Sequence, residues 1–121
     1  MKYMLLIYTR PGFGEELSEQ ERTELFGEVD ALMAELGESG ELVGGQALAD
    51  PSNTRTVRLR AGQPAVTDGP FIESKEQFGG YVIVECESPQ RAAEIAARWP
   101  DVRLGGGIEI RPIMDESGAE M

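Results

Sequence analysis

The residues best equipped for chemistry in this sequence lie in one stretch, Val66 to Glu85, which reads VTDGPFIESKEQFGGYVIVE. Asp68 heads an Asp-Gly-Pro-Phe turn, and Glu73, Lys75 and Glu76 follow it closely. A carboxylate at such a place acts as a general acid or base if burial raises its pKa. The alternative is structural, because Asp-Gly-Pro is ordinary turn chemistry and charged residues commonly form a solvated cluster.

The composition excludes several classes of active site. Histidine is absent, and Cys86 is the single cysteine among 121 residues. The commonest general base and the commonest metal ligand are therefore missing, which argues against zinc, copper and histidine-activated nucleophiles. Carboxylates alone could bind magnesium or calcium, but no EF-hand spacing is present. We expect no metal and no other cofactor.

The charge balance restricts the partners. The chain carries 22 acidic and 11 basic residues, a formal net charge of -11. This acidic protein is a poor match for nucleic acid or an anionic membrane, since both require a basic surface. No apolar run approaches the length of a membrane span, and the first eight residues do not form a signal peptide. We expect a cytoplasmic location.

The elements that must position the candidate residues follow the order β-α-β-β-α-β. Four apolar or alternating runs predict strands: Lys2–Tyr8, Thr54–Arg60, Tyr81–Cys86 and Ile108–Ile110. A capping box at 18–21 starts the first helix, which Gly37 or Gly40 ends. Ser88 caps the second helix and Pro100 closes it.

The remaining segments add little to this order. Residues 42–48 form a short, glycine-interrupted additional strand in this interpretation. Trp99 lies on the apolar stripe of the second helix and is predicted to belong to the core. Residues 1–114 are expected to form a single domain, and residues 115–121 a flexible tail.

The polarity of the strands predicts their places in the sheet. Lys2–Tyr8 and Tyr81–Cys86 are apolar on both faces, so they should be central. The other two predicted strands alternate, so they should lie at the edges. The pattern predicts an α+β, ferredoxin-like sheet with strand order 4-1-3-2 and both helices on one face. The uncovered face would then be apolar, which predicts a homodimer with two sheets packed face to face.

This topology brings distant segments to one end of the sheet. The end of the first strand, the long excursion at 61–80 and the glycines at 105–107 should meet there. The candidate ligand-binding residues at this end are Tyr8, Arg10, Asp68, Gly69, Phe71, Glu73, Lys75 and Tyr81. We expect Asp68, the catalytic candidate, to be less exposed than an aspartate at a turn tip. It should accept hydrogen bonds from nearby backbone amides.

Several segments together resemble a known family. They are MKYMLLIY, LVGGQAL, TVRLR, the VTDGPF stretch and GGGIEIRPI, and the resemblance covers nearly the whole chain. The sequence resembles the YCII-related family, in particular its DGPF-motif branch. The resemblance implies a dimeric α/β barrel, in which ferredoxin-like subunits pair through their sheets. It also implies a regulatory context, because some DGPF-type proteins occur with extracytoplasmic-function sigma factors.

For some family members a His-Asp pair has been suggested as an active site. Asp68 matches the aspartate, whereas the histidine has no counterpart in this chain. Three functions follow, in this order. The first is a homodimer that binds a small molecule in the cavity near Asp68. The second is an enzyme that uses Asp68, Glu73 or Glu76 as a general acid or base. The third is an interaction module whose acidic surface meets a basic protein.

Overall fold

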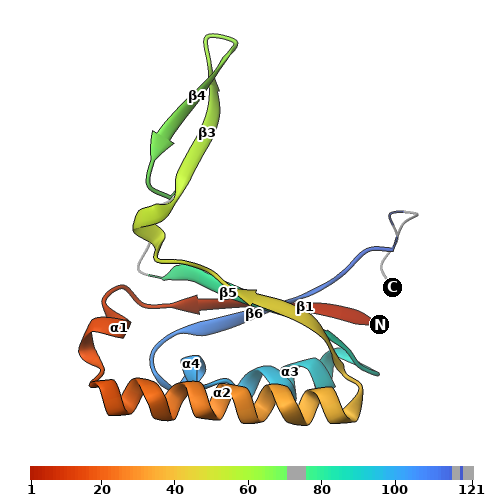
Figure 1. Ribbon diagram of the computed structural model, residues 1–121. Helices are drawn as coiled ribbons and strands as arrows, with labels where there is room; N and C mark the ends of the chain where they lie inside the picture. Colours follow the sequence, from red (N-terminus) through yellow and green to blue (C-terminus); the bar gives the residue numbers. More distant parts are fainter. Residues whose placement is uncertain (71–75, 116–117, 119–121) are drawn as a thin grey trace.

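The computed structural model describes residues 1–70, 76–115 and 118. Within these residues, a four-stranded antiparallel sheet carries two long helices on one face, and a separate two-stranded hairpin projects from the body (Figure 1). The sheet and its helices consist of β1 (Lys2–Thr9), α2 (Glu19–Ser39), β2 (Leu42–Ala47), β5 (Gln77–Glu85), α3 (Pro89–Ala97) and β6 (Gly107–Pro112). The hairpin and the short helices are β3 (Arg55–Arg60), β4 (Gln63–Asp68), α1 (Phe13–Glu16), η1 (Pro51–Asn53) and α4 (Pro100–Arg103).

Local sequence signals set the limits of the two long helices. Ser18 Oγ accepts a hydrogen bond from the Glu21 amide, and the Glu21 carboxylate accepts one from the Ser18 amide, so the predicted capping box is present. The helix ends at Gly40, whose φ of 81° suits a residue without a side chain. Ser88 Oγ caps α3 by accepting a hydrogen bond from the amide of Arg91.

The core lies between the sheet and the two helices. Tyr3 and Leu5 of β1 pack with Val84 of β5 and with the helical residues Leu36 and Ile95. Trp99 is 4% exposed and belongs to the same cluster, as its position on the helical stripe predicted.

The predicted strand order is confirmed, with one correction. The sheet order is β2-β5-β1-β6, which is 4-1-3-2 when only the strands of the sheet are counted. The second of these strands is Leu42–Ala47 and not Thr54–Arg60. Gly45 explains the difference, because a Cβ there would meet the carbonyl oxygen of Tyr81 at 2.5 Å, so this segment pairs closely with β5 only as glycine.

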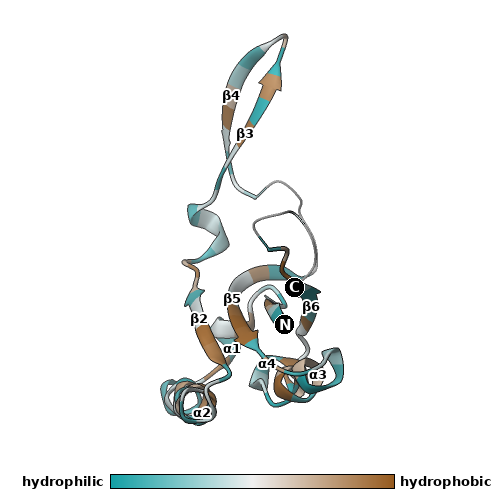
Figure 2. Ribbon diagram, turned by 90° about the vertical axis from the view of Figure 1, so that its right-hand side faces the viewer, coloured by the Kyte–Doolittle hydropathy of each residue, from teal (hydrophilic) through white to brown (hydrophobic). Residues whose placement is uncertain are grey.

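The predicted edge strand instead forms β3 of the hairpin, where it pairs with β4. We call this hairpin, residues 55–68, the arm. The arm rises from the side of the sheet opposite the helices (Figures 1 and 2), and the chain between β6 and Asp115 extends to the same side (Figure 1). An alternating pattern fits an edge strand and an arm equally well, because both have one polar face.

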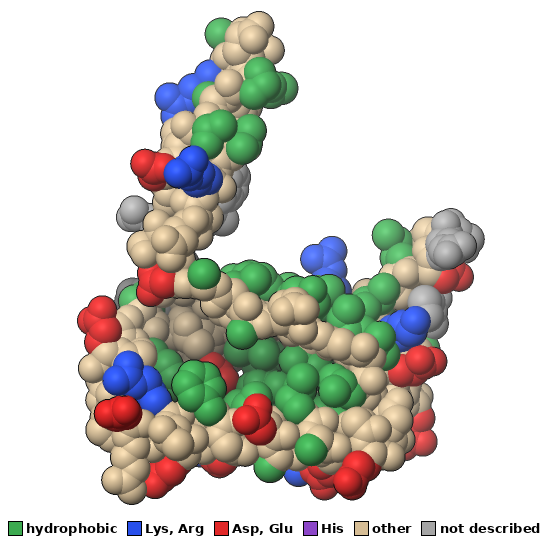
Figure 3. Space-filling model, in the orientation of Figure 1, with side chains coloured by type: hydrophobic (Ala, Val, Ile, Leu, Met, Phe, Trp, Pro, Cys, Tyr) green, Lys and Arg blue, Asp and Glu red, His purple; other side chains and the backbone are tan. Residues whose placement is uncertain are grey.

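The helix-free side of the sheet is what we call the open face. Met4 and Leu6 alternate with the buried Tyr3 and Leu5, so they lie on this face and are only half-buried. Ile83 of β5 lies opposite Met4 and is half-buried as well. Figure 3 shows hydrophobic side chains along the top of the body, between the arm and the C-terminal segment. The second apolar face predicted from the sequence is therefore present.

Candidate functional site

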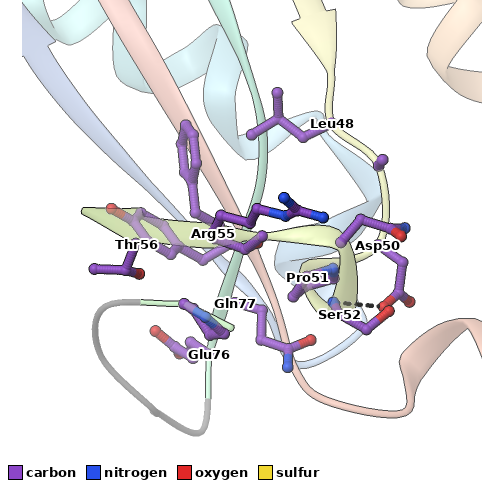
Figure 4. A pocket seen from close by; sticks show the side chains of 14 residues that line it. Leu48, Asp50, Pro51, Ser52, Arg55, Thr56, Glu76 and Gln77 are labelled. Atoms are coloured by element: carbon purple, nitrogen blue, oxygen red, sulfur yellow. Dashed lines mark hydrogen bonds between the residues drawn. The ribbon is translucent and has the colours of Figure 1, made fainter. Parts of the chain in front are cut away.

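A large, open cleft lies where the end of β1 and the start of β5 meet the base of the arm. Its volume is about 1280 Å³. The lining comes from Tyr8, the segment 48–56, Pro70 and the start of β5 (Figure 4). In the view of Figure 4, Asp50 and Ser52 lie on one side of the cleft and Glu76 on the other. Of the segments predicted to meet at this end of the sheet, the end of β1 and part of the 61–80 excursion line the cleft. The glycines at 105–107 are not among its lining residues.

An aromatic pair forms one wall of the cleft. The ring centroids of Tyr8 and Phe78 are 5.5 Å apart, with 57° between the ring planes. The pairing of β1 with β5 shifts register between Ile7 and Tyr8, so that Tyr8 lies opposite Phe78. Irregularities of this kind redirect side chains near binding sites. Phe78 is 37% exposed, so its ring is accessible from the cleft.

Tyr8 also supplies a phenol group to the cleft, and its neighbours shift the pKa of this group. A hydrogen bond to the Glu109 side chain, followed by burial and by the negative charges of Glu109 and Glu76, raises the pKa of the Tyr8 phenol. Tyr8 therefore keeps its proton at neutral pH and acts as a hydrogen-bond donor.

A tight turn forms the opposite wall. The carboxylate of Asp50 accepts a hydrogen bond of 2.9 Å from the amide of Ser52, and Pro51 opens the one-turn helix η1. Hydrogen bonds from Ser52 lower the pKa of the Asp50 carboxyl, so it is ionised. The amide of Leu48 bonds to the carbonyl oxygen of Gly79 at 2.9 Å, which attaches this wall to β5.

Two hydrogen bonds fix the base of the arm. The amide of Gly69 donates to the carbonyl oxygen of Thr54, and the Thr56 hydroxyl donates to the carbonyl oxygen of Gly69, both at 2.8 Å. Gly69 has a φ of 94°, which other residues rarely adopt. The glycine of the DGPF turn is thus needed to close the hairpin next to the cleft.

The prediction that Asp68 is protected is wrong. Its side chain is 96% exposed, and Arg55 Nε lies 4.0 Å from its carboxylate. The exposure arises because Asp68 ends a strand of the projecting arm instead of turning into the body. The structure gives this carboxylate none of the burial that would adapt it for proton transfer.

The other predicted residues are distributed differently. Tyr8 lines the cleft. Arg10 is engaged elsewhere: its guanidinium binds the Glu16 carboxylate at 2.7 and 2.5 Å and donates to the Leu104 carbonyl oxygen at 3.3 Å. Tyr81 lies opposite Leu6 on the open face and is not a lining residue. Phe71, Glu73 and Lys75 lie outside the described residues.

Several lining residues were not among the candidates. They include the whole segment 48–56 and Gln77. The one sequence signal for this wall is Asp50-Pro51-Ser52-Asn53, a typical turn sequence. This turn indicates a wall of the cleft only when the preceding strand, β2, is known to be the edge strand of the sheet.

Two findings concern metals and membranes. In residues 1–70, 76–115 and 118, no group of three potential metal ligands is placed to hold an ion. No helix in this part of the chain is long and apolar enough to span a membrane.

The sequence matches the YCII-related domain over residues 1–117. The chain belongs to the YCII-related family. It is 29% identical to an uncharacterised protein of Rhizobium meliloti over 114 residues, which cover 93% of this chain and 92% of the relative. The assignment agrees with the resemblance noted in the sequence, and Gly69 of the DGPF motif lies at the base of the arm of this YCII-related protein.

A solved structure has the same fold. It is the 5-chloro-2-hydroxyhydroquinone dehydrochlorinase TftG of Burkholderia phenoliruptrix, in complex with 2,5-dihydroxybenzoquinone. The TM-score is 0.56 at 15% sequence identity, and the match covers 99% of this chain and 100% of the other. At this identity the similarity establishes the ferredoxin-like α+β fold.

Proposed function

We propose that this YCII-related protein is a homodimer that binds a small aromatic molecule in the cleft beside Tyr8 and Phe78. The observation that carries the proposal is the aromatic pair at 5.5 Å, which forms an apolar wall directly beside polar groups. Small-molecule sites combine apolar walls with a few polar groups in this way. The family resemblance adds a regulatory context to the binding role.

The lining suggests the chemical class of the ligand. A flat ring would stack on the accessible face of Phe78. Hydroxyl or carbonyl groups on that ring would bond to the neutral Tyr8 phenol and to the amide of Gln77. The guanidinium of Arg55 would attract a negatively charged substituent. A hydroxylated benzene or quinone satisfies these conditions.

The open face supports the dimer. It carries Met4, Leu6 and Ile83, and no helix of the described residues lies over it (Figure 2). Packing two such faces together would bury these side chains, each of which gains free energy when it is removed from water.

Calorimetric titration with 2,5-dihydroxybenzoquinone and with hydroquinone tests the binding role. We expect saturable binding of at least one compound by the wild-type protein. Phe78→Ala should weaken this binding about tenfold. The stacking of a flat ring, such as a nucleobase, on one aromatic side chain contributes about 1–3 kcal/mol to binding. Phe26→Ala, which removes an exposed phenylalanine of α2 that does not line the cleft, is the control. Absence of saturable binding, or equal affinity in the Phe78 variant, contradicts the proposal.

A second function, proton-transfer catalysis, is favoured by one observation. The Tyr8 phenol is hydrogen-bonded to a carboxylate and lies in the cleft with Glu76, so an acid and a base are close together. Among the described carboxylates near the DGPF motif, Glu76 lines the cleft, whereas Asp68 is exposed. The dehydrochlorinase with the same fold suggests a probe: release of chloride from 5-chloro-2-hydroxyhydroquinone, which Tyr8→Phe should abolish and Tyr81→Phe should not.

A further inference from the structure

The arm has two chemically different faces. The pairing of β3 with β4 places Val57 opposite Val66 and Leu59 opposite Pro64, on one face of the hairpin. Val57, Leu59 and Val66 are 63%, 72% and 60% exposed. The other face carries arginine, threonine and glutamine side chains, because neighbouring residues on a strand point to opposite sides.

Such a hairpin is not expected to be stable by itself. A single two-stranded hairpin is at best marginally stable in water, and it needs a further strand or a packing surface over its apolar face. The described residues of the same chain leave the three large side chains of that face mostly exposed. The described part of the chain does not supply this surface, and another molecule can.

The position of the arm indicates where that molecule lies. The arm extends away from the helices, beside the open face (Figures 1 and 2). Each of its strands has six residues, which corresponds to a length of about 20 Å. Packed sheets are about 10 Å apart. A second copy placed on the open face would thus lie alongside the arm. The arm would extend beyond the sheet of that second copy.

The charges favour a second copy over other proteins with neutral or basic surfaces. Residues 55–68 contain three arginines and one aspartate, a net charge of +2. The whole chain carries -11, so the remainder carries -13. Helix α2 alone has seven acidic residues and one basic residue. The cationic arm of one copy and the anionic body of another are complementary, and such complementarity speeds and orients association.

We propose that each arm lies against the body of the partner subunit, with the face formed by Val57, Leu59 and Val66 packed on it. The two-fold symmetry of a dimer makes the contact reciprocal. This inference rests on the homodimer of the proposed function and gives it a specific interface. The strand that begins the arm also supplies Arg55 and Thr56 to the cleft. The partner therefore holds one wall of the binding cleft in place.

A matched pair of double variants tests the role of the apolar face. Val57→Gln/Leu59→Gln makes that face polar, while Ala65→Gln/Thr67→Gln places the same side chains on the opposite face. We expect the dissociation constant of the dimer, measured by sedimentation at several concentrations, to rise at least tenfold for the first variant. The control should change it less than threefold. An unchanged dissociation constant in the first variant would overturn the inference.

Photo-cross-linking with a folded arm gives a second test. Gln63→Cys in a Cys86→Ser background places one reactive thiol near the tip of the arm, where a maleimide-benzophenone can be attached. Mixed with isotope-labelled chains, this protein should cross-link to the body of a labelled partner. Dimers whose cross-links stay within one chain would refute the arm contact and leave the dimer and its ligand binding intact. Monomeric wild-type protein at micromolar concentration would refute both the arm contact and the dimer.

Discussion

Gly106 packs directly against the backbone of Tyr8. A Cβ on Gly106 would overlap the carbonyl oxygen of Tyr8 and would lie 3.1 Å from that of Asp101. The amide of Gly106 bonds to the same Asp101 oxygen at 2.9 Å. The glycine-rich segment before β6 thus permits close contact between two parts of the backbone, one of which carries Tyr8 into the cleft. Close backbone packing accounts for the glycine at position 106.

Gly106→Ala should therefore destabilise the protein. The new methyl group meets backbone atoms that cannot move independently, so we expect a loss of roughly 1–3 kcal/mol in the free energy of unfolding. Urea denaturation measures this loss. Gly107→Ala is the matched control, because a Cβ there has no neighbour within 4 Å. Equal stability of the two variants would show that the junction is not tightly packed.

The structure changes the expectation for Asp68→Asn. Because the carboxylate is 96% exposed and lies 4.0 Å from Arg55 Nε, we expect the unfolding free energy to change by less than about 0.5 kcal/mol. Thr56→Val, which removes the 2.8 Å hydrogen bond to the Gly69 carbonyl oxygen, should cost about 1 kcal/mol. Thermal unfolding of both variants shows whether the DGPF motif is stabilised by the hydrogen bond to its backbone or by the aspartate side chain.

The fold was largely predictable because its signals are local. The Ser18 capping box and the doubly apolar strands each indicate one structure, and the strand order follows from their polarity. The edge strand was misassigned because Thr54–Arg60 alternates in polarity, as an edge strand does. What decides against it is contact between Gly45 and β5, which depends on residues far apart in the sequence.

The site was less predictable for the same reason. Tyr8, a candidate because it ends the first strand, lines the cleft. Arg10 was assigned to the site by its proximity to Tyr8 in the sequence, yet its guanidinium forms two hydrogen bonds with Glu16. Which residue a side chain contacts depends on the geometry of the loop, and this geometry cannot be read from the spacing of residues in the sequence.

An ion pair between Glu41, which directly precedes β2, and Arg91 of α3 gives the protein an acid-sensitive contact. Arg91 donates two hydrogen bonds of 2.9 Å to the Glu41 carboxylate. These bonds, with a smaller contribution from Ser39, lower the pKa of Glu41 from 4.5 to about 2. A lowered pKa in the folded state stabilises the protein above pH 4.5, and this stabilisation is lost as the pH falls toward 2.

Glu41→Gln should remove this contribution. We expect it to lower the unfolding free energy at pH 7 by about 1–2 kcal/mol, because one partner of a charged hydrogen-bonded pair is lost. The difference from wild type should shrink between pH 4.5 and 2. Glu35→Gln, which breaks the exposed pair with Arg98, is the control and should cost less. A difference that does not depend on pH would exclude the ion pair as its source.

The open face provides a direct test of assembly. Ile83→Asp places a charge on this face, next to Met4, and should convert the dimer to a monomer at micromolar concentration. Val102→Asp adds the same charge to an exposed position of α4 and should leave the dimer intact. Light scattering measures both. A dimeric Ile83 variant with native stability would place the interface on another surface.

The hydrogen bond between Tyr8 and Glu109 should affect the pKa of the Tyr8 phenol. Because this bond and the nearby carboxylate charges raise the pKa of Tyr8 above 10, its phenolate forms at higher pH than that of a free tyrosine. The associated stabilisation is present below pH 10 and is lost as the pH rises through the raised pKa.

Glu109→Gln removes the charge and should lower the pKa of Tyr8. Ultraviolet titration of phenolate absorbance measures the change, with Tyr8→Phe to assign the signal and Glu85→Gln as a control on β5. If Glu109→Gln leaves the titration unchanged, Glu109 does not control the proton on Tyr8, and the proton-transfer function loses its main support.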